Sequence, residues 1–256
     1  MRYEILGPLR IIHGGRKFTL RAQKAEVLLA ALLVRSNQIV PSGVLVRELW
    51  EDDPPRRASD GLYVYVCQLR KFLADVSGGR KPIQTRSPGY SLQLEDGDLD
   101  LHQFQAAVLA GRRRLERQDW NAAAAAFDRA LSLWRDAPFG GLPGGPIVAG
   151  FALWLEEARL ECLELRMTAL VKAGRHREAV NELFSLIAEH PLHEAFYQLL
   201  MLALYRSNRQ ADAVRVYRRA RSLIVAEIGL EPGRAMRDLH QAILVADDSL
   251  DTMAAI

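Results

Sequence analysis

The side chains of this sequence whose type and spacing could do chemistry are cations and polar groups around two short segments. The first segment, PIQTRSPGYSLQL, runs from residue 82 to 94 and places two alternating runs around Ser-Pro-Gly, a pattern that predicts a β-hairpin. Its one charged residue, Arg86, lies at the bend. A guanidinium at the tip of a hairpin is suited to contact with an anion. The alternative is an arginine that is merely solvated on a loop.

The second segment, ASDGLYVYVCQLRKFLADV at 58–76, has the periodicity of an amphipathic helix. One helix face holds four apolar residues within about 60° of one another, and we expect it to be buried: Leu62, Val66, Leu69 and Leu73. The opposite face presents a candidate binding set: Asp60, Tyr63, Val64, Cys67, Gln68 and Lys71. Arg70 lies with Lys71 towards the helix end, and Arg56 and Arg57 precede the helix, so all four could contact phosphates. The alternative is a solvated helix face.

The elements that must position these two segments lie within residues 1–96. Residues 1–20 alternate loosely between Gly-Pro and Gly-Gly breaks, which predicts a small antiparallel sheet. Residues 20–37 (LRAQKAEVLLAALLVRSN) form an amphipathic pattern, and residues 42–50 (SGVLVRELW) predict a short helix with Ser42 as its N-cap. Three helices followed by a β-hairpin is the element order of a winged helix-turn-helix.

In that fold, the face of the third helix that points away from the core enters the major groove of DNA. The hairpin, or wing, places its tip over the adjacent minor groove, where an arginine meets a strongly negative potential. The sequence therefore predicts DNA contacts from the outer face of the third helix and from Arg86. The charge distribution agrees with DNA binding by the front of the chain. Residues 1–96 hold 15 Lys and Arg against 10 Asp and Glu, whereas the remainder holds 19 against 21.

From residue 97 onwards the pattern predicts helices, and an internal repeat is present. KAGRHREAV at 172–180 aligns with RSNRQADAV at 206–214 at an offset of 34, the period of tetratricopeptide repeats. Small and large side chains recur in three sets: Ala123, Phe127 and Ala130; Ala179, Leu183 and Leu186; Ala213, Tyr217 and Ala220. A Gly/Pro-rich insertion at 137–154 separates the first two sets. The alternative to a tetratricopeptide-like domain is a helical bundle with accidental spacing.

The sequence argues against an enzyme, because it has no phosphate-binding glycine loop, His-Glu-x-x-His motif, nucleophile elbow or paired cysteine motif. We expect His190 and His193, at a repeat boundary, to cap or pack rather than bind metal. The distant Cys67 and Cys162 predict no disulfide and a reducing cytoplasm. The N-terminus does not resemble a signal peptide, and no apolar run approaches the roughly 18 residues of a membrane span. We expect a cytoplasmic protein without cofactor, metal or membrane partner.

Specific motifs give the chain a family resemblance. QLRKFL at the end of the third helix and QTRSPGY in the hairpin are similar to the winged-helix effector domains of two-component response regulators, with Ser87 in place of a glycine. Residues 98–246 resemble the bacterial transcriptional activation domain, on LDLHQF, HPLHEAFYQLLMLALYRSNRQADAVRVYRRAR and GLEPG followed by LHQAIL. In this order the two resemble the Streptomyces antibiotic regulatory protein (SARP) family.

The resemblance implies a mainly α fold in three parts: a winged helix-turn-helix DNA-binding domain at 1–96, an all-α, tetratricopeptide-like activation domain at 97–247 and a tail at 248–256. It implies a transcriptional activator of a secondary-metabolite (antibiotic) gene cluster. Such a protein binds direct repeats in double-stranded promoter DNA, where it could form a dimer. It recruits the RNA polymerase holoenzyme through a sigma or alpha subunit.

The loop WEDDPPRR, between the second and third helices, faces the polymerase in the effector domains that it resembles. It contains Glu51, Asp52 and Asp53, and Pro54 and Pro55 stiffen it. A rigid negative loop suits a basic surface on a sigma or alpha subunit. The alternative is a solvated connector.

Two rival functions and one departure from the family stay open. A peptide-binding scaffold would explain the repeats but not the winged helix-turn-helix, and salt-dependent retention on heparin or DNA would exclude it. A repressor would have the same fold. SDGLYVYVC at 59–67 stands where the family has mainly polar residues, which predicts a different repeat sequence or weaker binding. Gly61 also weakens the first helical turn by up to about 1 kcal/mol relative to alanine.

Overall fold

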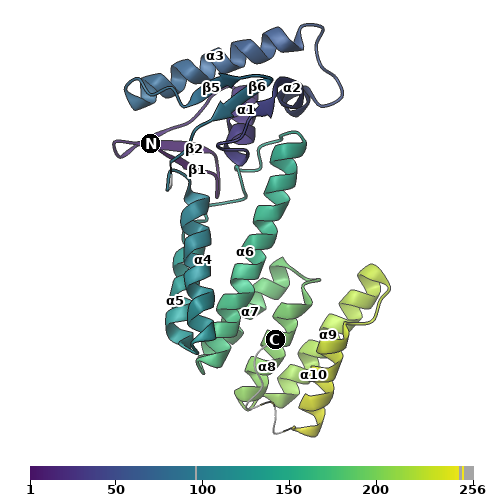
Figure 1. Cartoon of the computed structure of the whole chain (residues 1–256). Helices are drawn as coiled ribbons and strands as arrows, with labels where there is room; N and C mark the ends of the chain where they lie inside the picture. The colour runs from purple at the N-terminus through teal and green to yellow at the C-terminus, as the bar shows by residue number, and fades with distance from the viewer. Residues whose placement is uncertain (96, 248–249, 251–256) are drawn as a thin grey trace. The chain divides into compact units, whose positions relative to one another are not determined.

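The structure, a computed structural model, describes residues 1–95, 97–247 and 250 (Figure 1). Packing divides the chain into two compact units: residues 1–107 with 129–160, and residues 108–128 with the chain from 161 onwards. The described residues are mainly helical, and their strands lie in the first unit. This confirms the predicted fold class. The predicted tail at 248–256 lies outside the described residues except for Leu250.

The first unit begins with the antiparallel sheet predicted for residues 1–20. Its strands, in spatial order, are β1 (Arg2–Glu4), β2 (Arg10–His13) and β3 (Arg16–Phe18). Ile11 lies opposite Tyr3 on one side and opposite Phe18 on the other. Tyr3 and Ile11 are buried, so this row of apolar side chains fixes the sheet on the core.

Three helices and a second sheet form the winged helix-turn-helix. They are α1 (Gln23–Val34), β4 (Val40–Pro41), α2 (Ser42–Trp50), α3 (Ala58–Ser77), β5 (Ile83–Arg86) and β6 (Gly89–Leu92), with the strands in the order β4-β6-β5. The α3 face predicted to be buried is buried: Leu62, Val66, Leu69 and Leu73. The expectation that Ser42 caps α2 is wrong. Ser42 is the first residue of the helix, and its hydroxyl donates a hydrogen bond to the carbonyl oxygen of Pro88 at 3.2 Å.

A buried charge network joins the N-terminal sheet to two later segments, the start of α4 (Asp100–Glu116) and the chain that follows α5 (Trp120–Leu131). The Asp100 carboxylate accepts hydrogen bonds from the backbone N–H groups of Ile5 at 3.0 Å and Leu6 at 3.1 Å. Burial raises the pKa of Asp100, and these hydrogen bonds and the Arg135 guanidinium, 3.6 Å away, offset part of that rise. The Phe139 N–H donates to the Ile5 carbonyl at 2.9 Å. Residues after α5 are therefore part of the same core as the sheet.

The Gly/Pro-rich insertion also packs against α2, which the sequence does not predict. The second half of the insertion is helical, because α6 (Pro146–Lys172) begins within it. The buried Glu48 carboxylate accepts hydrogen bonds from the N–H groups of Ile147 at 2.8 Å and Val148 at 3.0 Å. It thereby caps the N-terminus of α6 from another element. Gly145 allows this approach, since a methyl group there would lie 2.7 Å from the Glu48 carbonyl oxygen.

The second unit contains the predicted repeat. Its helices after α6 are α7 (His176–Glu189), α8 (Glu194–Arg206), α9 (Gln210–Ile228) and α10 (Arg234–Val245), and each packs on its neighbours (Figure 1). The helices α7 and α9 begin 34 residues apart, at His176 and Gln210. All nine side chains of the small-and-large pattern are buried. A true repeat is therefore favoured over accidental spacing. Among the described residues, no helix is long and apolar enough to cross a bilayer.

Candidate nucleic-acid interface

The outer face of α3 is open to solvent, and the structure brings the predicted set together there. The exposed residues are Asp60, Tyr63, Val64, Cys67, Gln68 and Lys71. A hydrogen bond with Cys67, one turn away, raises the pKa of Tyr63. Asp60 and Gln68 can hydrogen bond to base edges, and Val64 can touch thymine methyl groups. The contacts of these residues with DNA stay a prediction.

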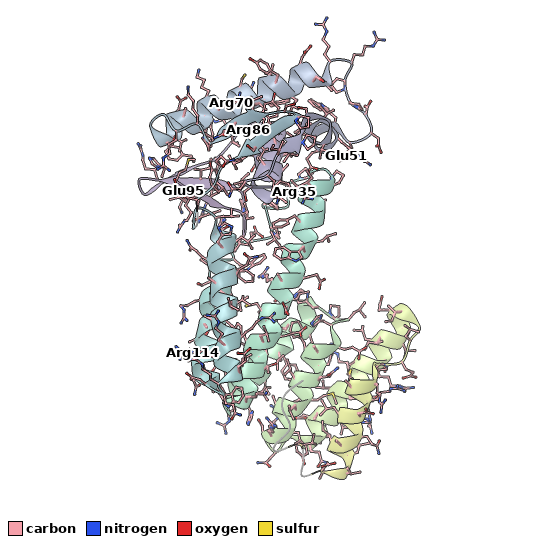
Figure 2. The ribbon with its side chains drawn as sticks, viewed as in Figure 1. Arg35, Glu51, Arg70, Arg86, Glu95 and Arg114 are labelled. Atoms are coloured by element: carbon pink, nitrogen blue, oxygen red, sulfur yellow. The ribbon has the colours of Figure 1, made fainter. Side chains whose placement is uncertain are left out.

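Arg70 lies between α3 and the wing rather than among the outward side chains (Figure 2). Its Nε donates to the Ile83 carbonyl at 3.1 Å, and its Nη2 donates to the Thr85 hydroxyl at 2.8 Å. The guanidinium also lies 5.7 Å from the centre of the Tyr90 ring, a cation–π distance. These contacts tie both wing strands to the third helix. The predicted phosphate contact of Arg70 is untested, and it would have to share the guanidinium with the wing.

Arg86 is the last residue of β5 and pairs with Gly89 across a two-residue turn, as expected for the bend of the hairpin. Its side chain is exposed on the wing (Figure 2). Its Nε and Nη2 donate to Gln84 Oε1 at 3.2 and 2.9 Å. The Pro88 carbonyl accepts a hydrogen bond from the Ser42 N–H at 3.1 Å, which ties the turn to the start of α2. The wing tip is therefore held on both sides before any DNA arrives.

Further cations flank α3 at both ends. Arg56 and Arg57 are exposed just before its first turn, as the sequence suggests. Arg80 and Lys81 are exposed in the loop between α3 and β5, and they are not among the residues predicted from the sequence. The sequence signal for these two cations is the dipeptide Arg-Lys between Gly-Gly and Pro, which indicates a charged loop after the third helix. Both ends of α3 therefore have the charge to contact phosphates.

The acidic loop, which we define as Glu51–Pro55, connects α2 to α3. Its three carboxylate side chains are exposed, and Figure 2 shows Glu51 at the end of α2. Glu51 has φ of 52°, in the left-handed region that non-glycine residues rarely adopt, and its N–H donates to the Arg47 carbonyl at 2.8 Å. The packing of α2 on α3 next to this loop favours glycine at position 61, because a methyl group there would lie 3.1 Å from the Trp50 ring.

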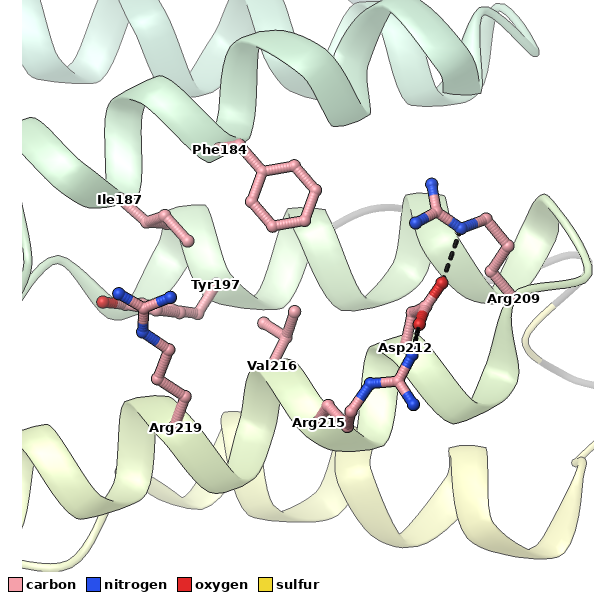
Figure 3. Close-up of a pocket in the computed structure, with 8 residues that line it drawn as sticks. All are labelled: Phe184, Ile187, Tyr197, Arg209, Asp212, Arg215, Val216 and Arg219. Atoms are coloured by element: carbon pink, nitrogen blue, oxygen red, sulfur yellow. Dashed lines mark hydrogen bonds and ion pairs between the residues drawn. The ribbon is translucent and has the colours of Figure 1, made fainter.

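The second unit offers a small cavity, of about 190 Å³, between α7, α8 and α9 (Figure 3). Phe184, Ile187 and Val216 form its apolar part. The Asp212 carboxylate is paired with Arg209 at 2.7 Å and with Arg215, and the Arg209 hydrogen bond lowers its pKa. Asp212 is therefore a fixed anion and is not suited to general acid or base catalysis.

His193 and the two cysteines are the other titratable side chains that the sequence brings into question. His193 pairs with Glu164 and packs on Phe196 with ring centres 4.4 Å apart, which confirms the packing role expected for it. Cys67 and Cys162 are free cysteines. In the part of the chain that the structure describes, no group of three or more His, Cys, Asp or Glu could hold a metal ion.

Comparison with known proteins agrees with this geometry. Residues 15–92 match the family model of the C-terminal domain of transcriptional regulatory proteins, and residues 99–244 match the bacterial transcriptional activator domain. The chain is 33% identical to the regulatory protein DnrI of Streptomyces peucetius, in an alignment that covers 98% of this chain and 94% of DnrI. The chain belongs to the SARP family. SARP proteins are transcriptional regulators and activators, not enzymes.

Other SARP relatives differ in length. Over all 256 residues of this chain, the identity to the regulatory protein AfsR of Streptomyces coelicolor is 37%, and the alignment covers 25% of AfsR. It is 33% identical to MoaR1 of Mycobacterium tuberculosis, over 95% of this chain and 79% of MoaR1. The solved structure of M. tuberculosis EmbR with a low-affinity phosphopeptide superposes with a TM-score of 0.91 at 30% identity, covering 98% of this chain and 67% of that chain. The two family models lie on either side of residue 96, and the domain boundary there stays a prediction.

Proposed function

We propose that this SARP protein binds direct repeats in promoter DNA in a sequence-specific manner and activates transcription of a secondary-metabolite gene cluster in the cytoplasm. The observation that carries the proposal is the pairing of two exposed elements, the outer face of α3 and the Arg86 wing. Arg70 links them through Ile83 and Thr85. Because helix and wing are fixed to one another, they can read a major groove and the adjacent minor groove in a single register.

A footprint on the DNA around the protein's own gene tests this proposal. We expect two protected direct repeats and an affinity that falls steeply with salt concentration. Titration on one and on two repeats then gives the stoichiometry, and cooperative binding of two copies supports a dimer on DNA. If nothing is protected even at low salt and the protein does not bind heparin, the DNA-binding proposal is wrong and a peptide-binding scaffold takes its place.

The same proposal includes recruitment of the RNA polymerase holoenzyme, through a sigma or alpha subunit, by the acidic loop. Glu51, Asp52 and Asp53 are exposed beside the α3 outer face, where repulsion from phosphates favours a position off the DNA. The double variant Asp52→Ala with Asp53→Ala should retain promoter affinity but yield less transcript in a reconstituted assay. Unchanged transcript yield would make the loop a connector. If wild-type protein lowers the yield, the protein is a repressor.

A further inference from the structure

The first half of α6 has a solvent-exposed face that is made of apolar residues. Residues 146–155, PIVAGFALWL, carry no charged side chain, and a helix that is apolar on all sides is normally buried on all sides. Val148 and Leu155 are buried, as expected. The other side is exposed at positions spaced by three and four residues: Pro146, Ala149, Gly150, Leu153 and Trp154. We call this set the α6 stripe. Leu153 is 71% exposed and its neighbour Trp154 is 45% exposed, so two large apolar side chains lie side by side in solvent as a patch.

The α6 stripe is held in place by contacts within the first unit. Glu48 caps the first turn of α6 through the Ile147 and Val148 N–H groups. Phe151 stacks on Trp154 with ring centres 5.1 Å apart and planes 28° apart, and Phe139 lies 6.4 Å from Phe151. The Trp154 ring is therefore ordered before binding, which lowers the entropy that a partner would have to offset.

The α6 stripe is continuous with the acidic loop. A cavity of about 250 Å³ lies where the two meet, lined by Arg47, Glu51, Asp52, Gly144, Gly145, Pro146 and Ala149. Two carboxylates against one guanidinium give this cavity a negative balance, and its other wall is the start of the stripe. Leu153 follows Ala149 by one helical turn, on the same side of α6. Glu157, exposed one turn further on, adds another negative charge.

We propose that the acidic loop and the α6 stripe form one docking surface for a segment of RNA polymerase that carries a lysine or arginine next to apolar side chains. The cation enters the cavity between Glu51 and Asp52, and its aliphatic stem lies along Pro146 and Ala149. The apolar neighbours pack on Leu153 and Trp154. Charge complementarity selects this partner, since the stripe alone would fit any apolar surface, whereas the cavity requires a cation. This inference rests on the proposed recruitment of polymerase.

The test compares three variants in binding and transcription. Leu153→Lys places a cation on the stripe, Asp52→Ala with Asp53→Ala removes two carboxylates from the acidic loop, and Leu109→Lys on α4 is the matched control because Leu109 is also exposed on a helix. Purified holoenzyme is titrated onto promoter DNA saturated with each variant. We expect the first two to weaken holoenzyme binding by about tenfold or more, as central interface residues do, and Leu109→Lys to match wild type. Promoter affinity and thermal unfolding confirm that each variant is folded.

The outcomes separate this inference from the proposed function. If the aspartate variant loses binding and Leu153→Lys does not, recruitment by the acidic loop stands and the α6 stripe is not part of the docking surface. If Leu153→Lys loses binding and the aspartate variant does not, a joint surface is excluded. If Leu153→Lys only changes the sedimentation of the free protein, the stripe is an interface between copies, and the inference is overturned. Cross-linking from a benzoylphenylalanine at position 153 to a polymerase subunit supports it.

Discussion

At the scale of one residue, Arg86 is the most direct test of the DNA interface. Gln84 engages its Nε and Nη2, which leaves other guanidinium donors free to meet a minor groove. We expect Arg86→Ala to weaken promoter binding by about 1–3 kcal/mol, and more at A/T-rich wing sites, with unchanged circular dichroism. Gel-shift titration measures this loss. Arg16→Ala, on the other sheet, removes the same charge as a control, and an equal loss in both variants would contradict a wing contact.

Arg70 carries a second residue-scale prediction, because its charge and its shape have different roles. Lysine keeps the charge but cannot make the forked contacts to Ile83 and Thr85. We expect Arg70→Lys and Arg70→Ala both to lower the free energy of unfolding by about 1–2 kcal/mol and to weaken DNA binding. The salt dependence of binding should stay near that of wild type.

The opposite result for Arg70 would point to a phosphate contact. In that case Arg70→Lys binds like wild type, and Arg70→Ala lowers the slope of log K against log salt by about 0.9. Urea unfolding together with a salt titration of both variants therefore decides between wing positioning and phosphate binding.

At the scale of elements, Glu48 couples α2 to α6. Its buried carboxylate accepts two N–H groups at the positive end of the α6 dipole. We expect Glu48→Gln to lower the free energy of unfolding by about 1–2 kcal/mol, because an amide supplies a weaker acceptor and places an N–H₂ group against N–H donors. Urea unfolding measures this change. Glu51→Gln, three residues along in the exposed loop, is the control, and equal stability of the two variants would show that the cap contributes nothing.

Elements that depend on local sequence could be predicted, and those that depend on distant partners could not. The period of α3 placed Leu62 and Val66 in the core, and the Ser-Pro-Gly turn placed the wing. The strand β4 has only two residues, too few to show alternation. Glu48 looks like a solvated residue in VRELW, and it is buried because its partners, Ile147 and Val148, lie about a hundred residues away in the chain.

The site shows the same division. Exposure of the α3 outer face follows from the helical period, so the candidate set could be listed from sequence. The contacts of Arg70 depend on how the hairpin packs across α3, and QLRK next to the helix end indicates only a cation. Residues 137–145 resemble a glycine-rich loop in the sequence. Their packing on the N-terminal sheet could not be predicted, because backbone hydrogen bonds such as that from the Phe139 N–H to the Ile5 carbonyl do not depend on residue type.

At the scale of the whole molecule, residues 1–96 carry an excess of positive charge and the remainder of the chain does not. This difference predicts which residues make DNA binding depend on salt. We expect replacement of Arg56, Arg57 and Lys71 by alanine to lower the slope of log K against log salt by about 0.9 for each residue that contacts phosphate. The loss of affinity should be alike for all DNA sequences, because phosphates carry no base information. Fluorescence anisotropy at several salt concentrations measures both.

The control for that experiment is a second triple variant with the same change in net charge: Arg113→Ala, Arg218→Ala and Arg237→Ala, on α4, α9 and α10. These arginines are exposed in the second unit. We expect their removal to leave the slope close to wild type. A change as large as that of the first set would place the second unit against DNA, and a loss confined to one base position would assign a base contact instead.

The hydrogen bonds from Ile5 and Leu6 to Asp100, and from Ile147 to Glu48, limit how this protein could be given a new DNA target by exchange of domains. A chimera that joined the first 96 residues of one relative to the remainder of another would pair a sheet and an α2 helix with foreign versions of the segments that complete their core. A functional chimera would have to take residues 97–107 and 129–160 from the same relative as residues 1–96. We therefore expect the promoter specificity of this protein to be changed more readily by substitutions on the α3 outer face and the wing than by exchange of residues 1–96.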